Sequence, residues 1–581
     1  MKTLFTAILL IALVALVPSS SFAQAVDSVV VAALPPGNLN KVINGDTLAT
    51  GGGRVNPNRV YVLKQTGAVD TVYFITSQIS INGNLTLVGK TNPITGKPPV
   101  IEPFINSDNS SPGNFIQALT GKTVSCKNIY FLGTRTDKAS VTPQCISASG
   151  DSITFKFDHC IVEHVGETST PNIFNTWSSS HDKIFITNCE LRDNQSDVPQ
   201  NPGCNWCDPG MYPVDTAIYS NNTMFVMGGC VEGSGQDAGY FKFDHNTMFM
   251  QTKSAPFTLQ QMHNSVITNN IFFGVNSAGL DSAHIYNPAV RNANFYTVPA
   301  IIELDTLSTM KATPYFYTEA SRKIVVTNNA YFWPAKIVAN FATINSDPVY
   351  RALGTGPVTA PIWKASSIPD LLNNATLYPL INISSTTNVN VDPGFDATLV
   401  SAASDSMARF VKVCWEQGNG QNSRPFVYRT DPTKLFAGVA ANWATTQNYP
   451  VQENLRYTNT TLKTAGSDGL PLGDLNWFPE YHPLGVKEMS NSLPSEFNLS
   501  QNYPNPFNPS TSIRVSLHQA GAMSLTIYNL LGQVVRVVDQ GNKQAGEYVY
   551  DVNMDKLGSG VYFYTLRQGN NSISKKMLLL K

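Results

Sequence analysis

The sequence is poor in charged residues, and the charges it has are balanced. Asp, Glu, Lys and Arg make up 14% of the 581 residues, and 39 basic residues face 40 acidic ones; roughly 25% charged residues is usual. Nucleic acid is therefore not an expected partner, because phosphate binding needs a clustered positive field. Long helix-forming stretches are almost absent after the N-terminus, whereas Asn, Thr, Ser and Gly are abundant. This composition predicts an all-β protein of one very large or several ordinary domains.

Long apolar runs are also missing, except at the N-terminus. There Lys2 precedes the apolar stretch 4–17 and the small residues SFAQA, a pattern typical of a secretory signal peptide over residues 1–25. No later stretch approaches eighteen consecutive apolar residues, so we expect no transmembrane segment in the mature protein.

A six-residue segment built around Asn or Cys recurs along the middle of the chain. Most copies are 24 to 33 residues apart, and apolar residues flank the turn at alternate positions. This spacing is typical of the coils of a parallel β-helix; a β-sandwich, the alternative, would show hairpin signals at shorter spacings. The copies are CKNIYF (126–131), DHCIVE (158–163), TNCELR (187–192), SNNTMF (220–225), DHNTMF (244–249), TNNIFF (268–273) and TNNAYF (327–332).

Aligning the copies on their fourth-last residue gives a polar column. Stacked Asn amides can satisfy one another and the turn backbone, and Asn tolerates the left-handed conformation that a corner needs. We expect the apolar residues three before and two after this column to fill the interior. The column reads Asn128, Cys160, Cys189, Asn222, Asn246, Asn270 and Asn329.

The segment FKFDH occurs twice, at 155–159 and 241–245, and each copy places a carboxylate beside an imidazole. A catalytic dyad, a surface binding site and a structural unit of the coil are three interpretations. The alternation places Phe155 and Phe157 inside and Lys156 and Asp158 outside. The structural interpretation is favoured, because His159 and His245 take the place that is Asn188, Asn221, Asn269 and Asn328 in other copies.

The chain has eight cysteines, and its expected export would take it through an oxidising environment in which disulfides can form. Cys204 and Cys207 form a C-x-x-C in a loop rich in Pro and Gly. No second pair or histidine stands at zinc spacing, so we expect a disulfide there and predict no metal site. Cys160 and Cys189 would stack about 4.8 Å apart in adjacent coils, which suits either a disulfide or two free thiols.

A long loop interrupts the repeat after residue 191 and gathers charge and aromatic rings. Loops on a rigid scaffold often carry function. Trp206 could stack on a sugar ring, Arg192 could meet a uronate carboxylate, and the acids could bind hydroxyls or Ca²⁺. The alternative is that Arg192 only pairs with Glu163 one coil away. The candidate substrate-binding residues are Glu163, Arg192, Asp193, Trp206, Asp208 and Tyr212, and the insertion 276–322 is a second candidate region.

The last residues resemble the C-terminal sorting domain of type IX secretion substrates. The motifs QNYPNPFNP, IYNLLGQVV, SGVYFY and the terminal KKMLLLK carry the resemblance. Short alternating strands with Gly, Pro and Asn turns predict a small C-terminal β-sandwich over 496–581, after a linker at 483–495. The resemblance implies contact with the type IX machinery and a location outside the cell, released or attached to the outer-membrane surface.

The coil region resembles the pectate-lyase-like right-handed parallel β-helix superfamily. SQISINGNLTLVGK (77–90), KNIYF (127–131) and VDPGF (391–395) carry this resemblance, which implies a right-handed parallel β-helix over 26–482. The coil pattern is lost over 396–480, which we expect to hold the last coils and a cap. Members include polysaccharide lyases, glycoside hydrolases and proteins without known catalysis. The calcium-binding aspartates and the Arg-x-Pro-x-x-Arg signature of pectate lyases are absent, as are the paired aspartates of polygalacturonases. Catalytic residues are therefore unassigned, and whether the chain is an enzyme stays open.

Two functions stay open at this point. The first is a secreted or cell-surface protein that binds or processes a polysaccharide, such as an acidic glycan, with Ca²⁺ open as a cofactor. The second is a non-catalytic structural or adhesive rod. The long, uneven loops favour the first, because a simple rod does not need them, although this argument rests partly on analogy of fold.

Overall fold

We analysed a computed structural model of the chain. Apart from one or two positions within some of the ranges, the structure describes residues 27–48, 53–136, 144–165, 172–194, 205–208, 214–228, 231, 238–251, 256–258, 262–277, 300–303, 318–348, 360–364, 376–417, 454–481, 486–488 and 497–580. The expected signal peptide lies outside them.

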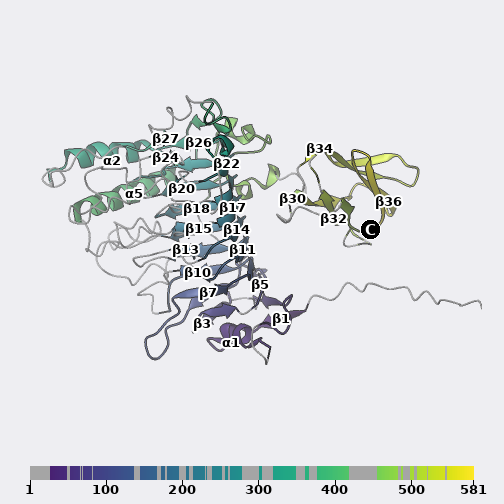
Figure 1. The fold of residues 1–581 in the computed structure, drawn as a ribbon, viewed down its shortest axis with the longest axis horizontal. Coiled ribbons are helices and arrows are strands. Elements are labelled where there is room, and N and C mark those ends of the chain that lie inside the picture. The colour runs from purple at the N-terminus through teal and green to yellow at the C-terminus, as the bar shows by residue number, and fades with distance from the viewer. Residues whose placement is uncertain are drawn as a thin grey trace, which may run out of the picture. The chain divides into compact units, whose positions relative to one another are not determined.

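The first part of the chain winds into stacked coils, as Figure 1 shows. The strands of the coils form three sheets, and each sheet makes one face of the stack. Sheet A contains β1 (Ser28–Val31), β2 (Val60–Leu63), β5 (Leu85–Gly89), β8 (Thr123–Lys127), β11 (Thr154–Asp158), β14 (Asp182–Thr187), β17 (Val214–Ser220), β19 (Ala238–Asp244), β22 (Asn264–Thr268), β25 (Lys323–Thr327) and β28 (Ile381–Ile383).

The second face, sheet B, has ten strands. They are β3 (Val72–Ile75), β6 (Val100–Pro103), β9 (Tyr130–Leu132), β12 (Ile161–Glu163), β15 (Glu190–Asn194), β18 (Thr223–Met227), β20 (Thr247–Gln251), β23 (Ile271–Phe273), β26 (Ala330–Phe332) and β29 (Val389–Asn390).

The third face, sheet C, is in two parts. The first contains β4 (Ile79–Ile81), β7 (Asn114–Leu119), β10 (Gln144–Ser149), β13 (Asn172–Asn175) and β16 (Asn205–Asp208), and the second β21 (Phe257–Thr258), β24 (Ala300–Glu303) and β27 (Ile362–Lys364). In every described pair of the three sheets each strand runs parallel to the next, which confirms the predicted parallel β-helix. Strand β24 shows that the insertion 276–322 contributes at least one strand to a coil.

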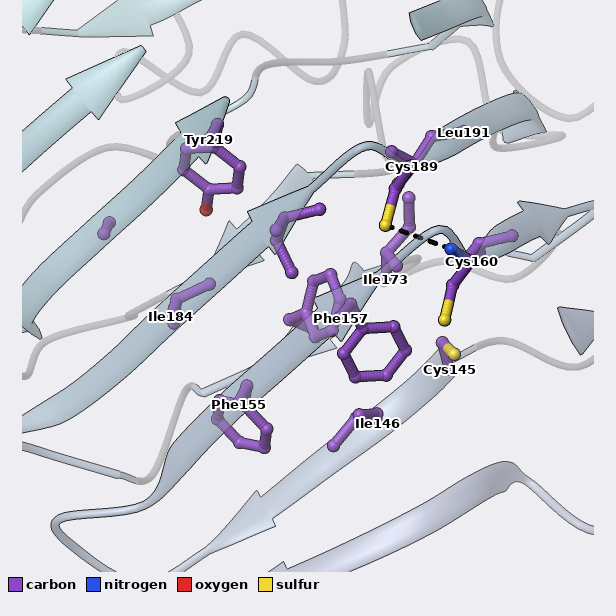
Figure 2. Packing of buried hydrophobic residues seen from close by; sticks show 14 of the residues in the cluster. Cys145, Ile146, Phe155, Phe157, Cys160, Ile173, Ile184, Cys189, Leu191 and Tyr219 are labelled. Atoms are coloured by element: carbon purple, nitrogen blue, oxygen red, sulfur yellow. Dashed lines mark hydrogen bonds between the residues drawn. The ribbon is translucent and has the colours of Figure 1, made fainter. Parts of the chain in front are cut away.

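Apolar side chains from the three sheets fill the interior. Phe155 and Phe157 are buried, whereas Lys156 is exposed and Asp158 half-exposed, as the alternation predicted. Figure 2 shows both rings pointing into the interior with Ile184 and Tyr219 from later coils. The ring centre of Phe157 lies 5.1 Å from that of Phe174 on sheet C, so the aromatic residues join different faces of the coil.

The corner between sheets A and B is a column of left-handed residues. Their φ angles lie between 52° and 62°, a region that Asn adopts more readily than most residues. His159 and His245 stand in this column, which confirms that each replaces a turn Asn. The column contains Asn128, His159, Asn188, Asn221, His245, Asn269 and Asn328.

The expected alignment of the first copy was wrong by one residue. Lys127 pairs with Asp158, which puts Asn128 in step with His159 and Ile129 in step with Cys160. Later copies carry two adjacent asparagines, one for the left-handed corner and one for the position after it. The single Asn128 could therefore be assigned to either position, and the structure places it at the corner.

The second polar position forms the predicted ladder of amides. Each side-chain nitrogen donates to the next side-chain oxygen, at 2.8 Å from Asn222 to Asn246, 3.2 Å from Asn246 to Asn270 and 2.9 Å from Asn270 to Asn329. A further rung at Asn388 was not predicted. Cys160 and Cys189 stack beneath the ladder as free thiols, with the Cys160 nitrogen 3.4 Å from the Cys189 sulfur (Figure 2), so they form no disulfide.

Helices accompany the coils where the repeat gives no signal. Helix α1 (Asn38–Gly45) contacts β3 and β4 near the first coils and buries Leu39 and Ile43. Helices α2 (Ala335–Ser346) and α5 (Ala397–Gln417) pack together, and Lys336 pairs with Asp405. The region 396–480 was expected to hold the last coils and a cap; its described part contains α5 and 3₁₀ turns at Thr461–Thr464, Leu475–Trp477 and Pro479–Tyr481 but no strand.

The C-terminal unit is a small antiparallel β domain, as expected. One sheet contains β30 (Val486–Glu488), β31 (Asn498–Leu499), β32 (Ser510–Leu517) and β35 (Gly546–Asn553), and the other contains β33 (Gly521–Tyr528), β34 (Val534–Lys543), β36 (Gly560–Gln568) and β37 (Asn571–Leu579). Leu525 and Ile527 lie in its core. Strand β30 falls inside the expected linker 483–495 but pairs with β35, so part of that segment belongs to this domain.

Candidate functional site

Two charged residues interrupt an aromatic column on sheet B. Glu163 and Arg192 pair directly across β12 and β15, and the next residues in the column are Phe225 and Phe249, whose rings stack at 5.2 Å. The Arg192 guanidinium carbon lies 5.2 Å from the centre of the Phe225 ring. Leu132 precedes Glu163 in this column, as the one-residue shift of the first copy requires.

The two charges form the ion pair that was the alternative to a substrate contact. Arg192 Nε lies 3.9 Å from Glu163 Oε1, and Arg192 Nη1 lies 3.2 Å from Glu190 Oε2. The Tyr130 hydroxyl donates a hydrogen bond to Glu163 Oε2. Both side chains of the Glu163–Arg192 pair are only 1% exposed. At this burial their charged groups are not open to a polymer in solvent.

A second left-handed column runs near the ends of the strands of sheet B, and the sequence analysis missed it. It contains His164, Asp193, Val226, Met250 and Gly274, each directly after a copy of the repeat, with φ between 49° and 62°. Three of these positions are apolar or glycine, so no residue type marks the column in the sequence. His164 and Asp193 are the polar members, and both are buried beside Glu163.

The other loop candidates are described only in part. Trp206 and Asp208 belong to β16, which pairs with β13, but their side chains lie outside the described residues. Tyr212 and the expected Cys204–Cys207 disulfide also lie outside them. Asp215 is described, and its Oδ1 lies 2.9 Å from His181 Nδ1. The structure therefore brings Glu163, Arg192 and Asp193 together.

The first copy of FKFDH holds its carboxylate in a dense set of hydrogen bonds. Asp158 Oδ2 accepts from Lys127 Nζ at 2.6 Å, and Oδ1 lies 2.7 Å from His159 Nδ1 and 2.8 Å from Asn188 Nδ2. Burial alone would raise the pKa of Asp158, but the bonds from His159, Lys127 and Asn188 outweigh it and hold the pKa well below its usual range. Such a carboxylate is a weak proton acceptor, which favours the structural interpretation.

The second copy is covered by a segment far away in sequence. We call residues 465–477 the strap. His245 Nε2 lies 3.0 Å from Asp468 Oδ2, Asn269 Nδ2 donates to the Ser467 hydroxyl at 3.1 Å, and Trp477 Nε1 donates to the Thr223 hydroxyl at 2.7 Å. Burial lowers the pKa of His245, but Asp468 and the other acceptors raise it above its usual value.

The strap also brings in a buried carboxyl group. Asp474 Oδ2 accepts from the Thr223 hydroxyl at 2.6 Å, and burial raises the pKa of Asp474 to about 7 despite that bond. The side chain of His245 is thus 7% exposed, whereas the side chain of His159 in the first copy is 47% exposed. The two FKFDH copies share a backbone conformation and differ in what covers them.

The outer face of sheet A presents lysines and aromatic rings together. Thr154, Lys183, Thr216 and Tyr240 follow one another in a single column. Phe241 pairs with Ser265, so the residues before them, Tyr240 and Asn264, stand in step, and Asn264 pairs with Lys323 in the next coil. In the neighbouring column Lys156 Nζ lies 5.9 Å from the centre of the Phe185 ring. Within the described ranges, no carboxylate forms an ion pair with Lys156, Lys183 or Lys323, whereas Lys127 and Lys242 pair with Asp158 and Asp244. Lys156, Lys183 and Lys323 lie outside the six-residue copies and in different coils, so the sequence alone did not reveal the surface.

None of the helices in the described ranges is long and apolar enough to cross a membrane. In the comparisons with known proteins, no curated protein and no solved structure matches the chain. Residues 501–580 match the family model of the secretion system C-terminal sorting domain. This chain is therefore a secreted or cell-surface bacterial protein that carries a type IX sorting domain after a parallel β-helix.

Proposed function

We propose that the β-helix domain binds an acidic polysaccharide along the outer face of sheet A. The column from Lys183 to Lys323 carries the proposal, because it places cations at two points with Thr216, Tyr240 and Asn264 between them. Four strand spacings separate the two lysines, which is about 19 Å along the stack. A linear glycan with repeated carboxylates would lie along this column and meet both cations.

The types of side chain on this face suit a sugar polymer. Phe185 and Tyr240 are half-buried, so each offers part of a ring face, and threonine and asparagine supply hydrogen-bonding groups for hydroxyls. Lys156 and Lys183 are exposed on adjacent strands, about 4.8 Å apart along the stack. A parallel β-helix holds these groups in fixed register, which limits the entropy that binding must overcome.

The loop after β15 is a second proposed contact. Trp206, Asp208 and Tyr212 remain our candidates for ring stacking and hydroxyl binding there. Glu163, Arg192 and Asp193 are assigned the supporting role that their burial indicates. Binding is the activity proposed for these residues, and cleavage of the glycan would be detected separately as unsaturated uronates or new reducing ends.

The test is binding of the secreted protein to polygalacturonate, alginate and chondroitin sulfate, with a neutral glucan as the comparison. The double variant Lys156→Ala/Lys183→Ala should lose at least about tenfold in affinity for the acidic ligand, or about 1.4 kcal/mol. Added salt should weaken wild-type binding, because exposed charges are screened. The charge-matched control Lys41→Ala/Lys90→Ala removes two exposed lysines outside the two columns and should bind as wild type does.

Two outcomes would contradict the proposal. Unchanged affinity in a folded Lys156→Ala/Lys183→Ala variant would move the site away from sheet A. Failure of the folded wild-type protein to bind any acidic polysaccharide would favour the structural or adhesive rod. Absorbance of unsaturated uronates and new reducing ends, recorded in the same samples, would show whether the glycan is also cleaved.

A further inference from the structure

Three side chains that commonly bind metals meet at the end of β12 and β15. Glu163 and His164 are consecutive residues, and Asp193 comes from the next coil. Each offers one ligand atom, and the three atoms lie within 4.8 Å of one another. The residues are between 1% and 2% exposed. We propose that Glu163, His164 and Asp193 bind a divalent transition-metal ion that fastens the two coils together.

The backbone places the three side chains together by a specific arrangement. Glu163 pairs with Arg192, and the His164 nitrogen donates to the Arg192 carbonyl at 3.4 Å, so His164 and Asp193 stand at the same position of adjacent coils. Both adopt the left-handed conformation, with φ of 54° and 49°. This conformation is unfavourable for most residues other than glycine. Histidine and aspartate replace the Val226, Met250 and Gly274 of later coils, so a polar pair is confined to these two positions of the described column.

The charges around the cluster fit a bound cation. Glu163 and Asp193 bring two carboxylates into a buried environment, where charges are stable only when paired or bound to a metal. Arg192 lies beside both Glu163 and Glu190. A divalent ion would stabilise both carboxylates at once. Tyr130 and Arg192 contact Glu163 and would then orient its carboxylate toward the ion without binding the ion themselves.

The donor set selects the class of metal. One imidazole nitrogen with two carboxylates suits Zn²⁺ or Mn²⁺, whereas Ca²⁺ prefers a shell made of oxygens alone. This site thus differs from the Ca²⁺ site that the loop acids suggested. Because the cluster is buried, we infer a structural ion at the base of the loop after β15, independent of glycan binding on sheet A.

The test uses the secreted protein, stripped with a chelator and then dialysed against Zn²⁺, Mn²⁺ or Ca²⁺ in separate samples. Elemental analysis should find one Zn²⁺ or Mn²⁺ per chain, and the melting temperature should rise by several degrees with the preferred ion but not with Ca²⁺. The variants His164→Asn and Asp193→Asn keep a residue that tolerates the left-handed backbone. Each should lose the bound ion and the rise in melting temperature.

The matched control is His159→Asn, the same substitution at a left-handed position of the same coil but outside the cluster. It should retain the ion at full occupancy. If His164→Asn fails to fold, Asp193→Asn and the chelator experiment on wild type still decide the question. The proposal is overturned if none of the three ions changes the melting temperature of the wild type. It is also overturned if both variants bind the ion as wild type does, or if His159→Asn loses the ion as they do.

Discussion

His245 and Asp468 form an ion pair across 223 residues of sequence, with the His245 Nε2 and Asp468 Oδ2 atoms 3.0 Å apart. His159, which occupies the same position in an earlier coil, contacts the neighbouring Asp158 instead. The repeated segment therefore supplies a left-handed corner in both coils, and the strap gives one of these corners a second role. Covering the corner at His245 ties the non-repeating end of the domain to its middle coils.

Replacing His245 with Asn should destabilise the domain in a pH-dependent way. The pKa of His245 is raised in the fold, so its contribution is full below its unfolded pKa and is lost as pH rises through the folded pKa. The pKa of Asp468 is lowered, because its bond to His245 outweighs the effect of burial, so its contribution is lost as pH falls through that value. Since Asp468 is 44% exposed, we expect an effect of only about 1 kcal/mol.

The measurement is denaturant unfolding of wild type and His245→Asn at about pH 5.5 and about pH 9, on either side of the usual histidine pKa. The difference in unfolding free energy should be largest at the lower pH and shrink at the higher one. An equal difference at both pH values would mean that His245 acts through packing alone.

Phe157 and His159 lie two residues apart and should respond very differently to substitution. Phe157 is 1% exposed, and its ring centre lies 5.6 Å from that of Phe131. Phe157→Ala should cost roughly 3–5 kcal/mol of unfolding free energy through the cavity it leaves. His159→Asn should be nearly neutral, because Asn fills this corner in other coils. If His159→Asn abolishes an activity of the protein while the melting curve is unchanged, the structural interpretation of this motif is wrong.

Asp182 should make the fold less stable as pH rises. It is fully buried, and burial raises its pKa from 3.8 to about 7 although its Oδ1 accepts the Ile153 N–H at 2.8 Å. The folded state therefore holds a proton that the unfolded state releases, and unfolding free energy should fall between about pH 4 and about pH 7, by on the order of a few kcal/mol.

Asp182→Asn tests this directly, because the amide oxygen can still accept from Ile153 while the group no longer titrates. Its unfolding free energy should depend less on pH than that of wild type over the same range. Asp151→Asn is the contrasting variant, since hydrogen bonds from Ser180 lower the pKa of Asp151 and its contribution is lost on acidification. Identical pH profiles for wild type and Asp182→Asn would show that Asp182 is ionised throughout.

The parts of the fold that follow a repeating rule could be predicted from the sequence. Asn222, Asn246 and Asn270 recur because these coils use the same amide at the position after the corner, so a short-range rule is visible in these copies. Phe155 and Phe157 follow from alternation within one strand. The column containing His164 and Asp193 was missed because it requires only a left-handed backbone, which His, Asp, Val, Met and Gly all adopt there. No single residue type therefore marks it in the sequence.

Contacts made by non-repeating segments could not be predicted. Asp468 and Asp474 lie in the strap, whose sequence has no period and no local motif that points to His245 or Thr223. The lysine surface was missed for a related reason. Lys183 and Lys323 can be placed in one column only when the register of every intervening strand is known. An error of one residue, as at Asn128, would put a side chain on the other face of the sheet.

The C-terminal domain should be required for export but not for folding of the β-helix. It has its own core, containing Leu525, Ile527 and Tyr564, and residues 501–580 match the sorting-domain family. Because β30 pairs within this domain, the clean deletion removes residues 486–581. The truncated protein should accumulate in the periplasm, and its melting curve should match that of the β-helix in the intact chain.

Leu525→Ala weakens the core of the sorting domain but leaves the rest of its sequence unchanged. This variant should reduce export less than the deletion does. Normal appearance of the truncated chain outside the cell would refute the assignment of sorting to this domain, whereas an unfolded periplasmic product would show that the β-helix depends on it.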